Sequence, residues 1–589
     1  MITLILTSCG RYYRSKQKNC DYPRSYQLSV KGQASQTQNS QTQNSKSQIR
    51  NIIRGILCAS TVACVSSAFI PSTLAAEKVI ISAGPFKQEI PVSDLEQFSK
   101  TGKLSNSLQM YSAFFTPQVR EVLSRRLEVD PKVADKFFDE LVQTPAGKQL
   151  VASLGEAIPG SSIETLQATL SLALRGVKGL TPISFLRAYP ENSISIDASK
   201  AAEIALDFNS NRLQSQVTGI LLARELGIKT NTSFKSTFDP SIQGKEKFQQ
   251  QTFAFEDKKR SRKIPFELYW SSASNPQGSQ NPLIVLSHGF GANRKFLDYL
   301  GRHLASHGLT VVSVEHSGSN IAAVNKASKT GNVSEILAAK EYLDRPKDVS
   351  FVLDELAKLN NQPGQFQGKF NTENVSIIGH SLGGYTALAL VGAELNVGQL
   401  RQFCKASLSL SESPGDWLQC AAAPLQENKY QLQDSRIKSA IALNPLVGKL
   451  FGDNGINKIN KPVLVLTSTE DVLTPSLKHQ IKPFTQIRGN KYLLSAIGAT
   501  HLSVGDQSNL GSAATTLVRE RLGEETAALR KLTQGVTLAF VKQLTPEAET
   551  YKKFLTPAYA QSLSTSQVPL SLNTELPKNL LPWLDFAIK

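Results

Sequence analysis

The stretch that decides the fold reads Val375-Ser-Ile-Ile-Gly-His-Ser-Leu-Gly-Gly384, and residues 385–391 continue it with Tyr-Thr-Ala-Leu-Ala-Leu-Val. The β-branched start predicts a short buried strand, and the Ala- and Leu-rich continuation predicts a helix. Ser381 therefore stands on a sharp turn from strand to helix, where Gly379 and Gly383 leave room for a strained residue with an exposed hydroxyl. The Gly-x-Ser-x-Gly pattern is common by itself, and an ordinary serine in a glycine-rich turn is the alternative. In this context the pattern indicates a nucleophilic serine.

Short β-branched runs alternate with helical patterns on both sides of this turn. Such alternation predicts a mostly parallel sheet with helices on both faces. The expected fold class is α/β, and specifically an α/β-hydrolase fold with an eight-stranded sheet. The predicted strands cover residues 250–255, 264–270, 283–287, 309–315, 375–379, 437–443, 463–466 and 492–497.

A serine hydroxyl becomes a good nucleophile when a histidine takes its proton and an acid holds that histidine in the right tautomer. In this fold the acid and then the histidine follow the serine along the chain, on loops at the carboxyl edge of the sheet. Asp471 follows the predicted strand at 463–466, and His501 follows the last predicted strand. Glu470 is the neighbouring competitor, for which we expect a solvated loop position. His479 lies on a predicted helix only eight residues past Asp471, so the chain order favours His501 as the base.

The oxyanion of a tetrahedral intermediate needs two backbone N–H donors, each worth about 2.7–4 kcal/mol. Leu382, directly after the serine, supplies one in this fold. The other is expected from the loop after the strand at 283–287, which reads His-Gly-Phe-Gly and offers Phe290. We expect His380, beside the serine, to pack within the turn rather than to act as the base.

Three segments of the predicted hydrolase domain match a known family pattern. They are Ser287-His-Gly-Phe-Gly-Ala-Asn-Arg294, Leu304-Ala-Ser-His-Gly308 leading into Val312-Ser-Val-Glu-His316, and Ile378-Gly-His-Ser-Leu-Gly-Gly384. These segments strongly resemble the platelet-activating-factor acetylhydrolase (phospholipase) family, and also the dienelactone-hydrolase-like exported α/β-hydrolases. The resemblance covers about residues 245–510 and implies hydrolysis of short or oxidised acyl esters, phospholipids among them, with Ser381 as nucleophile and His501 as base. The helical region before it resembles the uncharacterised N-terminal domain of certain bacterial members.

The chain departs from the acetylhydrolase pattern at the acid. In that family the acid follows the strand that corresponds to residues 437–443, and this chain has Asn444 there. Because an amide cannot stabilise an imidazolium as a carboxylate does, the acid is expected at Asp471, as in most other α/β-hydrolases. Dienelactone hydrolase itself uses a cysteine where this chain has Ser381. The resemblance therefore does not assign the substrate of either family to this chain.

The chain divides into four predicted parts: a leader and signal segment at 1–75, a mainly helical domain at 76–240, the hydrolase domain at 245–510 and a C-terminal helical extension at 511–589. A hairpin is predicted within 78–92. Roughly six short helices are predicted to follow, each from an N-cap residue with a Pro or a Glu after it. Residues 76–240 contain no His or Cys, so we expect a packing or lid-like role for them. Residues 230–247, rich in Ser, Thr, Gly and Lys, read as a linker.

The start of the chain indicates export to the periplasm or the extracellular space. Arg50 and Arg54 precede an apolar run and then small residues up to Ala76, which is the order of a secretory signal. About 16 apolar residues are short for a membrane span. We expect cleavage near Ala75 or Ala76, and the alternative is an uncleaved N-terminal membrane anchor.

Charge and cysteine content narrow the partners. Lys and Arg number 65 against 48 Asp and Glu, without a tight basic stripe or zinc-finger spacing, so we expect either a mildly basic surface or peripheral affinity for an anionic membrane, rather than nucleic-acid binding. Cys404 and Cys420 remain after signal removal, and the sequence leaves two alternatives open for them: a loop disulfide worth about 3 kcal/mol, or two buried free thiols. They lie in a long connection, residues 394–434, that reads either as a lid or as a structural excursion. No cysteine or histidine spacing suggests a metal, and no cofactor is expected.

The predicted function is a serine esterase that hydrolyses small-molecule or lipid esters through an acyl-enzyme. An acyltransferase would use the same three residues. A non-catalytic, lipid-binding envelope protein is the alternative from another class, and the complete Ser/Asp/His set argues against it.

Overall fold

A computed structural model describes residues 75–83, 86–115, 117–124, 152–175, 181–230, 232–271, 281–330, 336–406, 412–506, 508, 520–582 and 584. The predicted signal segment and the helix starts at residues 130–131 and 144–145 lie outside these ranges. None of the described helices is long and apolar enough to cross a membrane.

The N-terminal part is a small α/β unit. The predicted hairpin forms from β1 (Lys78–Ala83) and β2 (Phe86–Pro91), and β3 (Ser193–Asp197) joins β1 in parallel, giving the order β2-β1-β3. Apolar side chains of this unit form a core of their own, separate from the cores of the larger sheet. The described helices of this unit include α3 (Val92–Thr101), η1 (Asn106–Phe114), α4 (Pro117–Ser124), α7 (Ile163–Arg175) and α8 (Pro182–Ala188).

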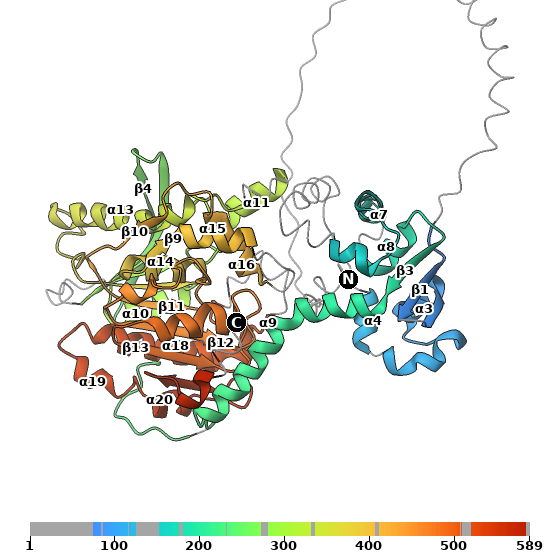
Figure 1. The fold of residues 1–589 in the computed structure, drawn as a ribbon. Helices are drawn as coiled ribbons and strands as arrows, with labels where there is room; N and C mark the ends of the chain where they lie inside the picture. The colour runs from blue at the N-terminus through green and yellow to red at the C-terminus, as the bar shows by residue number, and fades with distance from the viewer. Residues whose placement is uncertain are drawn as a thin grey trace, which may run out of the picture.

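A single long helix, α9 (Ala198–Glu225), carries the chain from the N-terminal sheet to the larger domain (Figure 1). The next residues, which we predicted as a linker, lie along the larger domain. Phe234 stacks its ring edge against Tyr559 at 5.3 Å between centroids, and the Pro240 carbonyl pairs with His303 Nε2 at 3.0 Å. The crossing between the domains is therefore helical.

The larger domain is built on a nine-stranded sheet in the order β14-β13-β12-β11-β8-β6-β7-β5-β4. The central strands run parallel, and β4, β5 and β14 are antiparallel to their neighbours. All eight predicted strands are present. They are β4 (Phe248–Asp257), β5 (Arg262–Ser271), β6 (Leu283–Ser287), β7 (Val311–Val314), β8 (Val375–His380), β11 (Ile437–Leu443), β12 (Val463–Ser468) and β13 (Lys491–Ala496).

The ninth strand, β14 (Leu570–Asn573), differs from the prediction, because it comes from the segment expected to be a helical extension. β14 pairs with β13, and the preceding helix α18 (Ala527–Lys542) buries its apolar face on the sheet. The hydrolase fold thus continues past residue 510. Two short helices, α19 (Ala548–Lys552) and α20 (Pro557–Ser562), connect α18 to β14.

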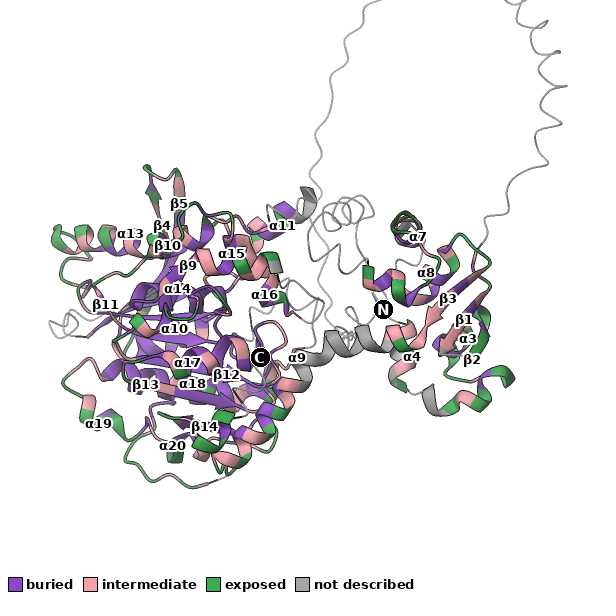
Figure 2. Ribbon diagram, viewed as in Figure 1, coloured by how far each residue is buried: buried purple, intermediate pink, exposed green. Residues whose placement is uncertain are grey.

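Helices pack on both faces of the sheet, and the central strands are buried between them (purple in Figure 2). Successive residues of the central strands point to opposite faces. Val375 and Ile377 of β8 pack in one core, with α13 (Glu341–Asn361) and α14 (Leu382–Val391). Ile378 packs in the other, with α10 (Asp298–Ser306) and α18. The carboxyl ends of the parallel strands are left as the edge at which loops meet.

Candidate active site

Ser381 occupies a strained turn between β8 and α14. Its φ of 54° and ψ of −117° lie outside the regions that non-glycine residues commonly adopt. The turn closes so tightly that a Cβ at Gly379 would lie 1.9 Å from the Gly383 carbonyl oxygen, and a Cβ at Gly383 would lie 2.0 Å from the Ser287 carbonyl oxygen. Both glycines of the motif are therefore required by contact. Backbone strain of this kind is found at functional sites.

Asp471 and His501 are paired. His501 Nδ1 lies 2.8 Å from Asp471 Oδ2, with both side chains buried. Asp471 sits on the loop after β12, and His501 on the loop after β13, so adjacent parallel strands bring them together. Further donors saturate the carboxylate: Leu473 N, Thr474 N, Thr474 Oγ1, Asn444 Nδ2 and Gln480 Nε2, at 2.8–3.1 Å.

The environment of this pair sets opposite pKa shifts. Burial by itself would raise the pKa of Asp471, but the His501 charge and the donated hydrogen bonds outweigh it and hold the pKa below its usual range. Burial would lower the pKa of His501, and the Asp471 carboxylate outweighs it and raises that pKa. Asp471 therefore stays ionised at neutral pH and stabilises an imidazolium at His501.

His380 links the serine turn to the histidine loop. Its Nε2 donates to the carbonyl oxygen of His501 over 2.9 Å, and its ring stacks on Phe296 at 4.5 Å between centroids. Burial lowers the pKa of His380 to about 3. His380 is thus a neutral packing residue whose remaining ring nitrogen has no partner among the described residues. This placement agrees with the sequence-based expectation that it packs within the turn.

The two predicted oxyanion donors both border Ser381. A Cβ at Gly289 would lie 3.1 Å from Ser381 Cβ, so the loop that carries the half-buried Phe290 runs directly beside the serine. Leu382 is the first residue of α14, where backbone N–H groups have no partner within the helix. Both predicted donors therefore belong to segments that adjoin Ser381.

Arg345, on α13, contacts the loop that carries Phe290, and the sequence did not predict this role. Its fully buried guanidinium donates to the His288 carbonyl oxygen and, over 2.8 Å, to Ser319 Oγ. Burial lowers its pKa to about 10, so it remains charged at neutral pH. The signal in the sequence is an arginine among the apolar positions of an amphipathic helix, which does not reveal what the arginine contacts.

Glu520 is a second unforeseen residue. Its Oε2 accepts the backbone N–H of Leu502, the residue after His501, over 2.8 Å, while Oε1 is buried without a partner among the described residues. Burial raises the pKa of Glu520 to about 7. It lies in the segment that the sequence assigned to an extension, so nothing pointed to its place beside the histidine.

The insertion after α14 borders the acid loop. It holds β9 (Glu394–Asn396), α15 (Val397–Ala406), α16 (Pro414–Gln419) and β10 (Lys429–Gln431). A disulfide joins Cys404 to Cys420, with the Cα atoms 5.8 Å apart. The backbone N–H of Gly415 donates to the Leu473 carbonyl oxygen over 2.8 Å, so α16 lies directly on the loop of Asp471.

The competing candidates lie elsewhere. His479 Nδ1 accepts from Val447 N over 3.2 Å, and its Nε2 pairs with Asp416 of α16 at 3.1 Å, so both ring nitrogens are engaged away from Ser381. Glu470 is partly exposed beside Asp471. Among the described residues there is no group of three or more His, Cys, Asp and Glu side chains that could hold a metal ion.

A serine on a strand-to-helix turn, an acid and a histidine on the loops after neighbouring strands, and this mostly parallel sheet define the chain as an α/β-hydrolase. It resembles the platelet-activating-factor acetylhydrolases. The family model described as platelet-activating factor acetylhydrolase, isoform II, matches residues 247–348, which include the Phe290 loop and end before Ser381. The model described as alpha/beta hydrolase of unknown function (DUF1400) matches residues 75–197, which end where α9 begins.

Three curated proteins show the same likeness. The platelet-activating factor acetylhydrolase of Cavia porcellus is 26% identical over 272 residues, covering 41% of this chain and 51% of the relative. Those of Canis lupus familiaris and Bos taurus are 29% and 28% identical over 141 residues, covering 19% of this chain and 32% of each relative. The chain thus spans about half or less of the length of these relatives.

Proposed function

We propose that this protein is a serine hydrolase of carboxylic esters. The observation that carries the proposal is the buried pair of His501 and Asp471, 2.8 Å apart, with the His501 backbone bonded to His380, the neighbour of the strained Ser381. A histidine held in one tautomer by an ionised carboxylate is the arrangement that activates a serine hydroxyl. The similarity to acetylhydrolases supports ester hydrolysis.

The proposed mechanism passes through an acyl-enzyme. His501 removes the proton from Ser381 Oγ as that oxygen bonds to the ester carbonyl carbon, and Asp471 stabilises the imidazolium. The backbone N–H groups of Phe290 and Leu382 hold the oxyanion. Collapse of the intermediate breaks the ester bond, and His501 gives its proton to the leaving alcohol. Water then repeats the sequence and releases the acid.

The substrate class that we propose is short-acyl or phospholipid-type esters. The relatives are named for hydrolysing the acetyl ester of platelet-activating factor, which supports a lipid with a short acyl chain. Ser381 itself is only 6% exposed, so little of its side chain is open to solvent. A series of p-nitrophenyl esters from C2 to C16 tests this, and a maximum of kcat/KM at the long end would contradict a short-acyl preference.

Covalent labelling tests the reaction. A fluorophosphonate should label the folded protein at Ser381, and Ser381→Ala should abolish both labelling and ester turnover. Ser317→Ala removes an exposed serine hydroxyl and should leave both unchanged. A folded protein that is neither labelled nor active on any ester of the series would refute the proposal. Release of more transfer product than free acid, with alcohols or lysolipids added, would assign an acyltransferase instead.

We also propose that the protein is exported and processed near Ala75 or Ala76. In support, Arg50 and Arg54 precede an apolar run and then small residues up to Ala76, which is the order of a secretory signal. N-terminal sequencing of protein from the exported fraction should begin at residue 76 or 77. Retention of the whole leader in the membrane fraction would indicate the anchored form.

A further inference from the structure

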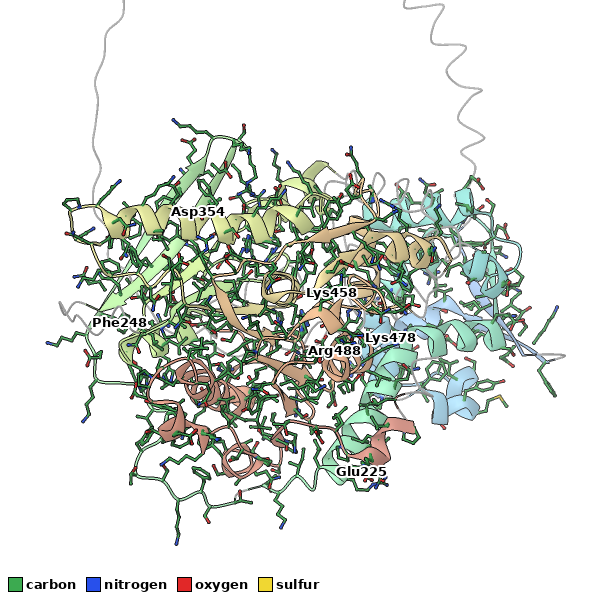
Figure 3. All side chains as sticks on the ribbon, turned by 60° about the vertical axis from the view of Figure 1, so that its left-hand side comes forward. Glu225, Phe248, Asp354, Lys458, Lys478 and Arg488 are labelled. Atoms are coloured by element: carbon green, nitrogen blue, oxygen red, sulfur yellow. A yellow bond between two sulfur atoms is a disulfide. The ribbon has the colours of Figure 1, made fainter. Side chains whose placement is uncertain are left out.

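Helix α9 connects the N-terminal domain to the loops of the candidate active site. It starts directly after β3, where the Asp197 carboxylate accepts the backbone N–H groups of Ser199 and Lys200 at 2.9 and 3.0 Å. Its last residue, Glu225, labelled in Figure 3, accepts from Asn579 Nδ2 of the hydrolase domain over 3.2 Å. Its two ends are thus fixed on different domains.

The helix touches the acid loop through a glycine. A Cβ at Gly219 would lie 2.8 Å from Thr469 Oγ1 and 3.1 Å from Thr469 Cβ, so any larger residue there would press on that hydroxyl. One turn later, Leu222 is buried against Leu477 and Ile481, on the helix that follows the acid loop. The approach is close because position 219 carries no side chain.

Thr469 joins the loop of the acid to the loop of the histidine. Its Oγ1 accepts the backbone N–H of Gly498 over 2.9 Å, and its own N–H donates to the Ala496 carbonyl oxygen over 3.2 Å. The next backbone N–H, of Glu470, donates to the Ala499 carbonyl oxygen over 2.9 Å. Asp471 directly follows Glu470, and His501 lies two residues after Ala499. The oxygen nearest to Gly219 therefore makes one of these three hydrogen bonds between the segment of the acid and the segment of the histidine.

We propose that Thr469 is a positioning residue for the His501–Asp471 pair, and that α9, seated on it at Gly219, lets the N-terminal domain hold the catalytic loops in register. The inference rests on the proposed esterase function. Close-packed interiors transmit small displacements, and a misplacement of about 1 Å at a catalytic group costs on the order of a hundredfold in rate. A control element can therefore act here without touching the substrate.

The test compares matched variants of the full chain. Thr469→Val keeps the shape and removes the acceptor, and we expect kcat to fall about tenfold or more with KM within about twofold. Thr469→Ser keeps the acceptor and should retain wild-type kcat. Gly219→Ala should lower kcat in the same way as Thr469→Val. Gly155→Ala is the control, because a Cβ at Gly155, also in a helix, meets nothing within 4 Å.

A pH profile separates positioning from loss of folding. His501 faces Asp471, His380 and Glu520, and of these the carboxylate of Asp471 holds the histidine charge most strongly. In a plot of kcat against pH, activity falls on the acid side as His501 becomes protonated; this part of the profile is its acid limb. If Thr469→Val loosens the pair, the pKa of His501 should fall and the acid limb should move to lower pH, while Thr469→Ser leaves it in place.

Unchanged kcat and an unchanged acid limb in folded Thr469→Val would overturn the inference. If that variant does not fold, Gly219→Ala decides in the same way. The esterase proposal fails separately, when wild-type protein shows neither turnover nor labelling at Ser381.

Discussion

Asn444 donates a hydrogen bond from Nδ2 to Asp471 Oδ2 over 3.1 Å. The asparagine follows β11 and the aspartate follows the adjacent β12, so both positions at which this sheet can present an acid are in contact. Only one of them carries a charge. An amide at 444 helps to keep Asp471 ionised, whereas a second carboxylate at that distance would raise the pKa of one of the two.

The first prediction concerns this pair. Asp471→Asn should lower kcat by about 10⁴-fold, because an amide leaves the histidine in the wrong tautomer. Asn444→Ala removes one of several donors to Asp471 and should retain most of the turnover. Asn444 thus donates a hydrogen bond to the acid but does not itself serve as the acid. Steady-state kinetics on a p-nitrophenyl ester measure both effects, and a larger loss from the asparagine variant would move the acid to position 444.

The second prediction concerns pH. The raised pKa of His501 places the acid limb of kcat/KM above about 6.5, the ordinary value for histidine, because the base must be neutral to accept a proton. Glu520, with a pKa of about 7, adds negative charge beside His501 as the pH rises. Glu520→Gln removes that charge, so the limb should shift to lower pH.

The control for this shift is Glu549→Gln, which changes an exposed carboxylate on α19 and should leave the profile unchanged. An acid limb that stays in place in Glu520→Gln would show that the Glu520 carboxylate does not act on His501.

The sequence predicted the centre of the fold because its signals are local. Residues 375–391 specify a strand, a tight turn and a helix through their own side chains, and the eight predicted strands formed for the same reason. β14 was missed because four residues become a strand only through pairing with β13, after the chain returns across α18. α9 was missed because its N-cap, Asp197, is followed by neither a Pro nor a Glu, the signals by which the other helices were predicted.

The candidate site divides in the same way. Ser381, Asp471 and His501 could be selected by their order relative to the strands, since the sheet determines which loops meet. Arg345 and Glu520 could not, because their roles depend on which backbone atoms lie within reach of the side chain after folding. Supporting residues of this kind do not form a recognisable motif in the sequence.

The third prediction concerns the disulfide of the insertion. Closing a loop of this size should stabilise the folded state by about 3 kcal/mol through the entropy of the unfolded chain. Cys404→Ser together with Cys420→Ser should therefore lower the Tm by several degrees, and reductant should lower the Tm of wild type toward that of the variant. The variant itself should not respond to reductant, and equal Tm values in all samples would indicate that the bond contributes no stability.

The last prediction concerns Arg345. Arg345→Met removes a buried charge and leaves the His288 carbonyl oxygen and the hydroxyl of Ser319 without their donor. Breaking a buried charged network typically costs about 3–5 kcal/mol, so the denaturation midpoint should fall markedly. Lys supplies a charge but not the planar fork of donors, and Arg345→Lys should therefore lie between Met and wild type.

The effect of Arg345 should also reach catalysis. The guanidinium contacts the loop that carries Phe290. In folded Arg345→Lys, kcat should therefore fall by a larger factor than KM rises, as expected for a group that acts on oxyanion binding. Lys358→Met, at the exposed end of the same helix, should change neither quantity. A loss of stability with full kcat in the folded fraction would restrict Arg345 to a structural role.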